Sequence, residues 1–254
     1  AKLVITNSYG HQFYITADLL SDNSDVTFVS MTGDMAGTGD YASYTNWKNA
    51  FTKVYESRYV SGIVAGLKIQ ELINDGKLTS ANYDGDNVKV GYVGAYDYAE
   101  VVSGYTAFYL GIKSVVDNVV MSVRYTNSWF DYDAEGEVAK ALIADGCVII
   151  GQHADSEGAP SACEAAYNNG TIVYSVGYNV DMLTAAPNAA LTSATNVWEV
   201  YYEYLFTSLL NGTEVATNWS EGYETGAVAI TTLGSAERFD GDIVPSTIKG
   251  ILIG

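Results

Sequence analysis

The hydrophobic positions along the chain form short apolar runs that alternate with longer stretches of helical periodicity. In the first part, apolar runs at residues 3–5 and 26–30 predict two strands. A helix is predicted over residues 55–74, where one apolar face recurs at three- and four-residue steps: Tyr59, Ile63, Val64, Leu67 and Ile73. The same helix carries small residues that would let a neighbouring segment approach closely: Ser61, Gly62, Ala65 and Gly66.

The rest of the chain reads as a regular alternation of strands and helices. It follows a polar loop at residues 82–87, which we take as a boundary between lobes. Strands are predicted at 88–94, 119–125, 148–151, 172–177 and 227–232, and helices at 101–115, 134–145, 160–168 and 195–210. Helical stretches of this length between strands indicate βαβ units, so the predicted fold class is α/β with mostly parallel sheets.

In such sheets the ligand lies beyond the carboxyl ends of the strands. The loops at these ends are rich in Asp, Asn, Ser and aromatic residues, and they cover residues 7–9, 32–40, 95–100, 127–132, 152–158 and 178–182. This composition favours a small polar ligand with a flat ring.

Composition and charge narrow the class of protein. With 254 residues, 48% of them hydrophobic, the chain has enough apolar material for a core, which excludes a disordered acidic chain. The formal charge of -18 argues against binding to nucleic acid or to an anionic membrane surface. No apolar stretch reaches the roughly 18 residues of a membrane-spanning helix. Residues 1–10 show no signal-peptide pattern, so we expect none in this chain.

Two loops resemble ion-binding motifs. The pattern Gly33-x-x-x-Gly37-x-Gly39 suggests a phosphate cradle. It fits neither the dinucleotide spacing GxGxxG nor GxxxxGK(S/T), and no helix clearly starts there, so an ordinary flexible loop is favoured. The segment that starts at Asp131 and contains Glu135 resembles the beginning of a calcium loop. Leu142 stands where such a loop needs a bidentate Glu, which favours a helix N-terminus with acids near the positive dipole end.

His153, Asp155 and Ser156 together suggest hydrolytic chemistry. The chain has no nucleophile elbow, so we favour hydrogen bonding of these residues to a ligand or to the loop backbone. With only two histidines and no Cys or His at ligand spacing, a zinc site is not expected. Cys147 and Cys163 could approach each other, but two buried free thiols are favoured over a disulfide.

Three residues at the strand ends allow two interpretations each. Trp129 follows a predicted strand closely and could belong to the core or stack on a ligand ring. Asp155 and Asp181 could each cap a neighbouring helix or bind ligand N–H and hydroxyl groups. The residues alone leave these alternatives open.

At these loops the chain resembles the basic membrane protein family, the purine-nucleoside-type type I solute-binding proteins of ABC importers. The segments that carry the resemblance occur in the family's order and spread over most of the chain: 55–66, 90–94, 127–131, 139–146, 152–156, 181–182 and 191–192, with Trp198, Tyr201 and Tyr202. The resemblance implies a binding protein without catalysis, and we expect neither a cofactor nor a metal. The implied ligand is a purine base or nucleoside clamped between two lobes.

The resemblance also implies how the lobes and partners are organised. Lobe 1 would comprise residues 1–86 plus about 190–225, and lobe 2 residues 87–189 plus about 226–254. The implied partner is an ABC permease in the membrane. The implied location is extracytoplasmic, either lipid-anchored at the cell surface or periplasmic, with anchor and signal peptide outside this chain.

Carried over residue by residue, the resemblance places Trp129 against the base and Asp155 with Ser156 at its polar edges. Asp181 would hold further N–H or hydroxyl groups. The remaining candidates line the cleft in the same loops: Asn7, Tyr9, Tyr98, Phe130 and Asn179. The loop with Asp97 and Tyr98, and the middle of residues 177–181, depart from the family's pattern, which leaves the exact ligand open.

One departure concerns the start of the chain. Family members begin with two βα units before a segment like residues 3–9, and these units are absent here. We therefore expect an incomplete first lobe with an unpaired sheet edge, and a chain that is a fragment or trimmed form. The alternatives to a solute-binding protein are an α/β enzyme acting on nucleosides or sugars, and a ligand-sensing receptor module of the same fold.

Overall fold

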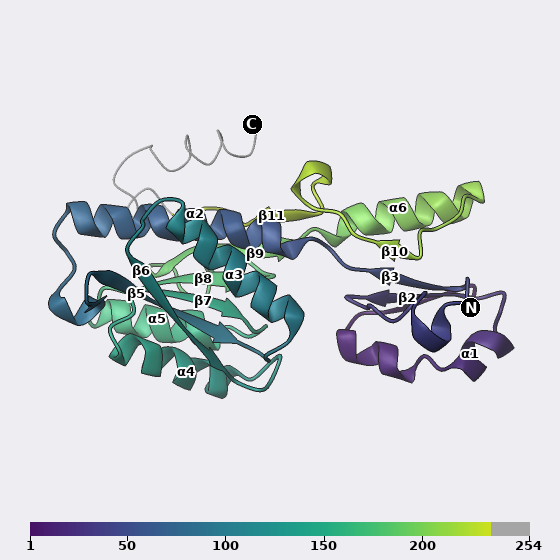
Figure 1. Cartoon of the computed structure of the whole chain (residues 1–254), viewed down its shortest axis with the longest axis horizontal. Helices are drawn as coiled ribbons and strands as arrows, with labels where there is room; N and C mark the ends of the chain where they lie inside the picture. Colours follow the sequence, from purple (N-terminus) through teal and green to yellow (C-terminus); the bar gives the residue numbers. More distant parts are fainter. Residues whose placement is uncertain (235–254) are drawn as a thin grey trace. The chain divides into compact units, whose positions relative to one another are not determined.

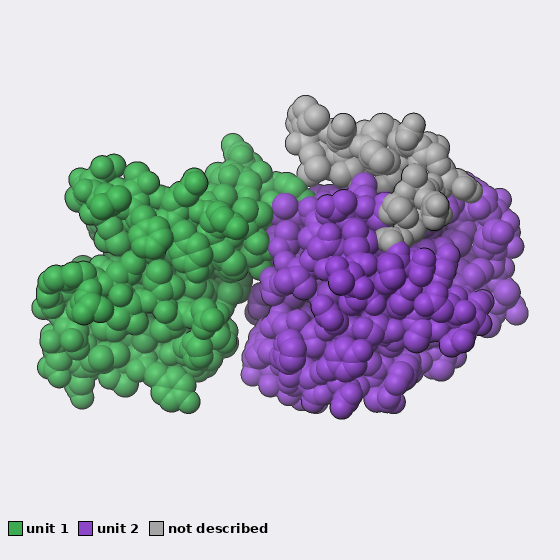
Figure 2. Space-filling view, turned by 180° about the vertical axis from the view of Figure 1, so that it is seen from behind, with its two compact units in different colours: residues 1–53, 196–228 green, residues 54–195, 229–254 purple. Residues whose placement is uncertain are grey.

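The computed structural model describes residues 1–234, which form parts of two compact units. Unit 1 comprises residues 1–53 and 196–228, and unit 2 comprises residues 54–195 and the chain from Ala229 on (Figure 2). Each unit is a layered α/β structure with a mostly parallel sheet, so the predicted fold class is confirmed. The predicted C-terminal part of lobe 2 beyond residue 234 lies outside the described residues.

Unit 1 is built on a four-stranded parallel sheet. The strand order is β1 (Leu3–Thr6), β2 (Thr27–Met31), β3 (Trp47–Ala50) and β10 (Asn218–Trp219). The helices α1 (Ala17–Asp22) and α6 (Trp198–Asn211) cover opposite faces of this sheet (Figure 1). Side chains of β2 alternate between the faces: Phe28 packs with Leu20 of α1, whereas Val29 and Met31 pack with Tyr201.

Unit 2 is built on a larger sheet with the order β11-β9-β8-β7-β5-β4, in which β6 pairs with β5. Its strands are β4 (Tyr83–Asp84), β5 (Asn87–Gly94), β6 (Val119–Tyr125), β7 (Ile149–His153), β8 (Tyr174–Tyr178), β9 (Ala190–Asn196) and β11 (Val228–Ile230). Strands β6, β5, β7, β8 and β9 run parallel. The chain leaves β5 toward β6 and returns to β7 on its other side, so the topological switch point lies between β5 and β7.

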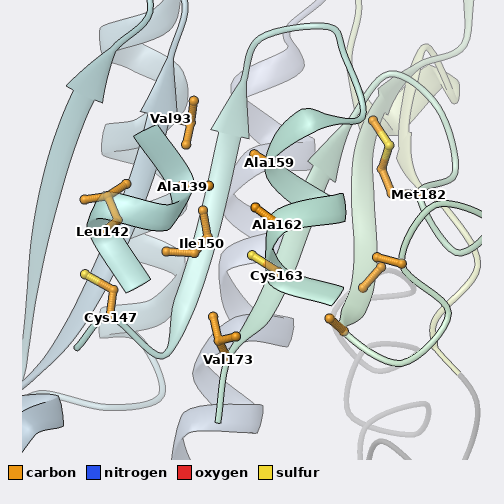
Figure 3. Packing of buried hydrophobic residues seen from close by; sticks show 13 residues of the cluster. Val93, Ala139, Leu142, Cys147, Ile150, Ala159, Ala162, Cys163, Val173 and Met182 are labelled. Atoms are coloured by element: carbon orange, nitrogen blue, oxygen red, sulfur yellow. The ribbon is translucent and has the colours of Figure 1, made fainter. Parts of the chain in front are cut away.

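Helices cover both faces of the unit 2 sheet (Figure 1). On one side lie α2 (Val54–Asn74) and α3 (Ala99–Lys113), and on the other α4 (Tyr132–Ala144) and α5 (Gly158–Asn168). The α4/α5 side encloses a core of Val93, Leu142, Ile150, Val173 and both cysteines (Figure 3). This core uses small residues such as Ala139 and Ala162 where the helices approach the strands.

Helices α2 and α3 approach each other backbone to backbone, and this contact requires glycine. A Cβ atom on Gly62 would lie 2.1 Å from the carbonyl oxygen of Phe108, and one on Gly111 would lie 2.1 Å from that of Tyr59. The predicted close approach at the small residues of this helix is therefore confirmed. The predicted apolar face is partly wrong, because Tyr59 is exposed while Val60 and Ile69 are buried. The sheet and α3 bury α2 on more than one side, so a single stripe does not describe it.

Two predicted boundaries differ from the structure. The division between the compact units falls after Lys53 and not at residues 82–87, because α2 packs on α3 and the loop forms a hairpin in unit 2. In this hairpin Tyr83 pairs with Val88 around a turn with Gly85 at φ +59°. The helix predicted over residues 195–210 is α6, which begins at Trp198 and not at residue 195, because Thr195 and Asn196 end strand β9.

The glycine contact gives a prediction with an unusual sign. Gly→Ala inside a helix is ordinarily stabilising by up to about 1 kcal/mol. Gly62→Ala should instead lower the free energy of unfolding by about 1–3 kcal/mol, because the new methyl group overpacks against backbone. Gly136→Ala in α4 is the matched control, since its Cβ would first meet Gly158 at an ordinary 3.5 Å. Urea denaturation measures both, and stabilisation by Gly62→Ala would contradict this account of the contact.

The two cysteines give a second prediction. Both are buried free thiols, as expected from the sequence, and burial raises the pKa of Cys147 to about 11 and raises that of Cys163 as well. Thiolate is the reactive form, so a thiol reagent such as DTNB should leave both groups unmodified in the native chain at pH 8. In 6–8 M urea (about the range that unfolds small proteins) it should modify both. Rapid modification of either thiol in the native chain would show that the α4/α5 core opens readily.

Candidate functional site

An aromatic group lies at the carboxyl edge of the unit 2 sheet, beside the switch point. Tyr96 and Tyr98, in the loop after β5, stack with ring centroids 5.0 Å apart and an interplanar angle of 10°. Trp129, in the loop after β6, lies 5.6 Å from Tyr96 and 6.3 Å from Tyr98. The indole is only partly buried, and Tyr98 is 47% exposed. The group therefore presents aromatic surface at the edge where ligands of such sheets bind.

A carboxylate and an amide are paired next to this aromatic group. Asp155, in the loop after β7, donates its backbone N–H to the carbonyl oxygen of Trp129 at 2.7 Å. Its Oδ1 accepts a hydrogen bond of 3.0 Å from the side-chain amide of Asn179, which directly follows β8. Burial raises the pKa of the Asp155 carboxyl, and the bond from Asn179 opposes that shift. The structure thus brings together three of the predicted residues, Trp129, Asp155 and Asn179, from three different loops.

Other predicted site residues have local structural partners. The hydroxyl of Ser156 is buried and accepts a 3.1 Å hydrogen bond from the N–H of Gly158, at the start of α5. Asp181 accepts one of 2.8 Å from the N–H of Leu183 in the turn that follows β8, so it caps a turn and not a helix. Phe130 is 70% exposed beside Trp129. All three residues lie in the expected loops. The side-chain oxygens of Ser156 and Asp181 each accept a hydrogen bond from the backbone N–H two residues further along the chain.

The hydrolytic interpretation of His153 does not fit the structure. The His153 side chain is fully buried, and its Nε2 lies 3.0 Å from Oε1 of Glu100 in α3. Its partner is therefore neither Asp155 nor Ser156, and the three residues form no triad. Burial and the neighbouring charge of Arg58 lower the pKa of His153 to about 4, with Glu100 opposing the shift. At neutral pH the imidazole is uncharged and donates its Nε2–H to the Glu100 carboxylate.

The sequence offered no sign that a buried arginine lies under this edge. Arg58 of α2 is 1% exposed, and its guanidinium carbon lies 3.9 Å from the ring centroid of Tyr178, the last residue of β8. Its Nη1 donates to the carbonyl oxygen of Gln152 in β7. A run of charges or an Arg at a motif position would have indicated a functional arginine. A single Arg within an apolar helix pattern gives no such indication.

In unit 1 the predicted residues Asn7 and Tyr9 follow β1. Asn7 is exposed, and Tyr9 begins the 3-10 helix η1 (Tyr9–Tyr14), where its ring meets that of Phe13 edge to face at 5.7 Å. Both residues therefore lie at the carboxyl edge of the unit 1 sheet, as the strand pattern predicted.

The glycine-rich loop after β2 is held closed by two amide side chains. Oε1 of the buried Gln12 accepts hydrogen bonds from the N–H groups of Asp34 (2.9 Å) and Met35 (3.1 Å). Asn49 of β3 accepts one from Ala36 at 3.1 Å. Three backbone N–H groups of the loop are therefore already bonded within the chain, which favours an ordinary loop over a phosphate cradle.

The acids at residues 131–135 serve the N-terminus of α4. Asp131 is the N-cap and accepts a 2.9 Å hydrogen bond from the N–H of Ala134, which confirms the favoured interpretation over a calcium loop. Within residues 1–234 no three His, Cys, Asp or Glu side chains are grouped so that they could hold a metal ion.

The arrangement in unit 2 is that of the type I periplasmic-binding fold, with the loops that hold the candidate residues at the carboxyl edge of a parallel sheet. Residues 2–242 match the family described as ABC transporter substrate-binding protein, PnrA-like, and the chain belongs to this family.

Individual relatives agree with this assignment. A purine-binding protein of Brucella abortus (strain 2308) is 32% identical over 89% of this chain and 57% of its own length. A putative ABC transporter glucose-binding protein of Haloferax volcanii is 30% identical over 88% of this chain and 50% of its own. The chain thus spans about half the length of these two curated relatives. A solute-binding protein structure from Aeropyrum pernix shares the fold, with a TM-score of 0.73, 15% identity, and coverage of 99% of this chain and 69% of that one.

The buried His153 gives a prediction for pH dependence. Its folded pKa of about 4 lies below the unfolded value of 6.5, so the unfolded chain takes up the proton first as the pH falls. The contribution of His153 to stability is fully present above about pH 6.5 and is lost as the pH falls toward about 4. NMR of the imidazole, assigned with His153→Gln, should show a neutral Nε2–H tautomer down to about pH 4. Titration of this ring near its ordinary pKa would contradict its burial between Glu100 and Arg58.

Proposed function

We propose that this chain is a ligand-binding part of the solute-binding protein of an ABC importer, and that it binds a purine base or nucleoside. The observation that carries the proposal is the aromatic group of Tyr96, Tyr98 and Trp129 beside the paired Asp155 and Asn179. Family membership and the name of the Brucella abortus relative support it.

The chemistry of these side chains suits a purine. A partly exposed indole offers a face for a flat ring, and stacking of a base on an aromatic side chain contributes about 1–3 kcal/mol. The Asp155 carboxylate accepts hydrogen bonds from ring N–H, amino or hydroxyl groups, and hydrogen bonds to charged groups contribute about 1.5–3 kcal/mol each. The amide of Asn179 is bonded to Oδ1, and Oδ2 is the oxygen that would accept from the ligand.

The partner and location follow from the family. A solute-binding protein of an ABC importer works outside the cytoplasm and delivers its ligand to a permease in the membrane, and we propose both for this protein, together with a lipid anchor or a periplasmic location. No helix within residues 1–234 combines the length and the apolar character that a bilayer crossing requires.

A sugar is the second candidate ligand, because the Haloferax volcanii relative is named as a putative glucose-binding protein. Aromatic faces and carboxylates also bind sugar rings, so the residue types of the site allow both. A thermal-shift screen with guanosine, adenosine, hypoxanthine, riboflavin and glucose separates the two, since a ligand in excess over its Kd raises the melting temperature. A shift with glucose and none with purines would overturn the purine proposal.

Trp129 gives the mutational test. Trp129→Ala should weaken binding of the best purine by about tenfold or more, because it removes a stacking face worth about 1–3 kcal/mol. Trp129→Phe is the control, since it keeps an aromatic face and should lose much less. Isothermal titration calorimetry measures the affinities, and equal affinity of wild type and Trp129→Ala would remove Trp129 from the site.

A separate test addresses the enzyme alternative. Chromatography of the nucleoside after incubation with the protein should recover the nucleoside unchanged, whereas a cleaved product would favour an enzyme.

A further inference from the structure

The loops that carry Trp129 and Asp155 meet at one buried carboxylate, that of Glu135. This residue lies in the first turn of α4 and is fully buried. Its Oε1 accepts two backbone hydrogen bonds, one from the N–H of Asp131 and one from the N–H of Ser156, each 3.2 Å long.

The two donors belong to different loops. Asp131 ends the loop after β6, which carries Trp129, and Ser156 follows Asp155 in the loop after β7. A third hydrogen bond joins the same loops directly, from the N–H of Asp155 to the carbonyl oxygen of Trp129 at 2.7 Å. Three hydrogen bonds therefore connect the aromatic face of the candidate site to its carboxylate, and two of them end on a single oxygen atom.

Helix capping alone does not explain why Glu135 is buried. The side chain of Asp131 already caps α4 through the N–H of Ala134, and the bond from Glu135 to Ser156 is not local to that helix. Burying a carboxylate is costly unless hydrogen bonds compensate. Within residues 1–234 the second oxygen, Oε2, has no hydrogen-bond partner. Burial raises the pKa of Glu135, the two backbone bonds oppose that shift, and the charge of Asp155 adds to it.

We propose that Glu135 is a positioning residue for ligand binding, and that its Oε1 sets the placement of the Trp129 indole relative to the Asp155 carboxylate. Glu135 itself is buried and touches no ligand. The proposal rests on the proposed function, because it assumes that these two side chains bind the ligand.

The loop after β7 has a second support, so loss of Glu135 should loosen the site without unfolding it. The side-chain amide of Gln152 donates to the carbonyl oxygens of Ala154 and Ser156 at 2.7 and 2.8 Å. These bonds hold the loop's carbonyl groups, whereas Glu135 holds the N–H group of Ser156.

The test compares three variants of the 254-residue chain. Glu135→Ala removes both acceptor bonds, and Glu135→Gln keeps an oxygen that can accept them. Glu137→Ala is the matched control, because Glu137 lies on the same helix with a side chain 72% exposed in an ion pair with Lys140. Hydrogen exchange at the amides of Asp131 and Ser156 reports the two bonds directly.

In Glu135→Ala we expect exchange at both amides to accelerate about tenfold or more, with the amides of β5 and β7 unchanged. Guanosine affinity should fall about tenfold or more in this variant, and should be restored to within about threefold of wild type by Glu135→Gln. Glu137→Ala should match wild type in both measurements.

Several results would overturn the proposal. Unchanged exchange at Asp131 and Ser156 in Glu135→Ala would show that Glu135 does not join the loops. Faster exchange with unchanged guanosine affinity would show that the joint does not position the site. An equal loss of affinity in Glu137→Ala would attribute the effect to α4 as a whole. If the wild-type chain binds no nucleoside, the proposed function fails by itself, and the exchange rates still decide whether Glu135 joins the loops.

Discussion

The candidate site depends on a buried positive charge, the guanidinium of Arg58. A charge taken out of water destabilises a fold by several kcal/mol unless the surrounding groups compensate, and at 1% exposure Arg58 has almost no solvent. Part of the compensation comes from the Tyr178 ring, the carbonyl of Gln152 and the nearby Glu100 carboxylate, which is bonded to His153. Within residues 1–234 the guanidinium Nε and Nη2 have no hydrogen-bond partner. Because Gln152 and Tyr178 lie at the ends of β7 and β8, the compensation also fixes the strand ends that carry Asp155 and Asn179.

In unit 2 the close packing of α2 on α3 determines how near the charges of Arg58 and Glu100 lie to each other. Arg58 and Glu100 reach the same place only because α2 and α3 touch backbone to backbone at Gly62 and Gly111. The cluster needs a glycine of its own, since a Cβ on Gly104 would lie 2.7 Å from Nδ1 of His153 and 3.6 Å from Nε of Arg58. A wider helix contact would separate the charges, and a dispersed cluster would leave Arg58 without compensation.

The elements that could be predicted from the sequence were those with a long or repeated pattern. The helix over residues 54–74 and the strands β5 to β8 could be predicted because each has a long apolar pattern, in which a single polar residue does not hide the periodicity. Strand β3 did not, because half of Trp47–Ala50 is polar: Lys48 and Asn49 are both buried. Asn49 is buried with its amide bonded to Ala36 and to Asn218, partners that only the folded chain provides. Strand β9 carries equally little hydrophobic signal, because apart from Leu191 and Asn196 it consists of Ala, Ser and Thr.

For the candidate site, the residue types and their position at the sheet edge could be predicted from the sequence. The sequence could not tell which side-chain oxygens already accept hydrogen bonds from backbone N–H groups. Asp181 and Ser156 accept hydrogen bonds from neighbouring N–H groups, whereas within residues 1–234 Asp155 has only its Oδ1 engaged, by Asn179.

The backbone conformation at Asn179 is a second feature of this pair. Three non-glycine residues of the described chain have positive φ, and each follows a strand end: Thr32, Asn127 and Asn179. Such a conformation costs about 1–3 kcal/mol and persists where the surroundings impose it. At Asn179, with φ +62°, the backbone N–H bonds to Ala194 of β9 while the side chain reaches Asp155. The sheet thus holds a strained residue in the orientation that fixes the carboxylate, which is the preorganisation that the proposed binding site requires.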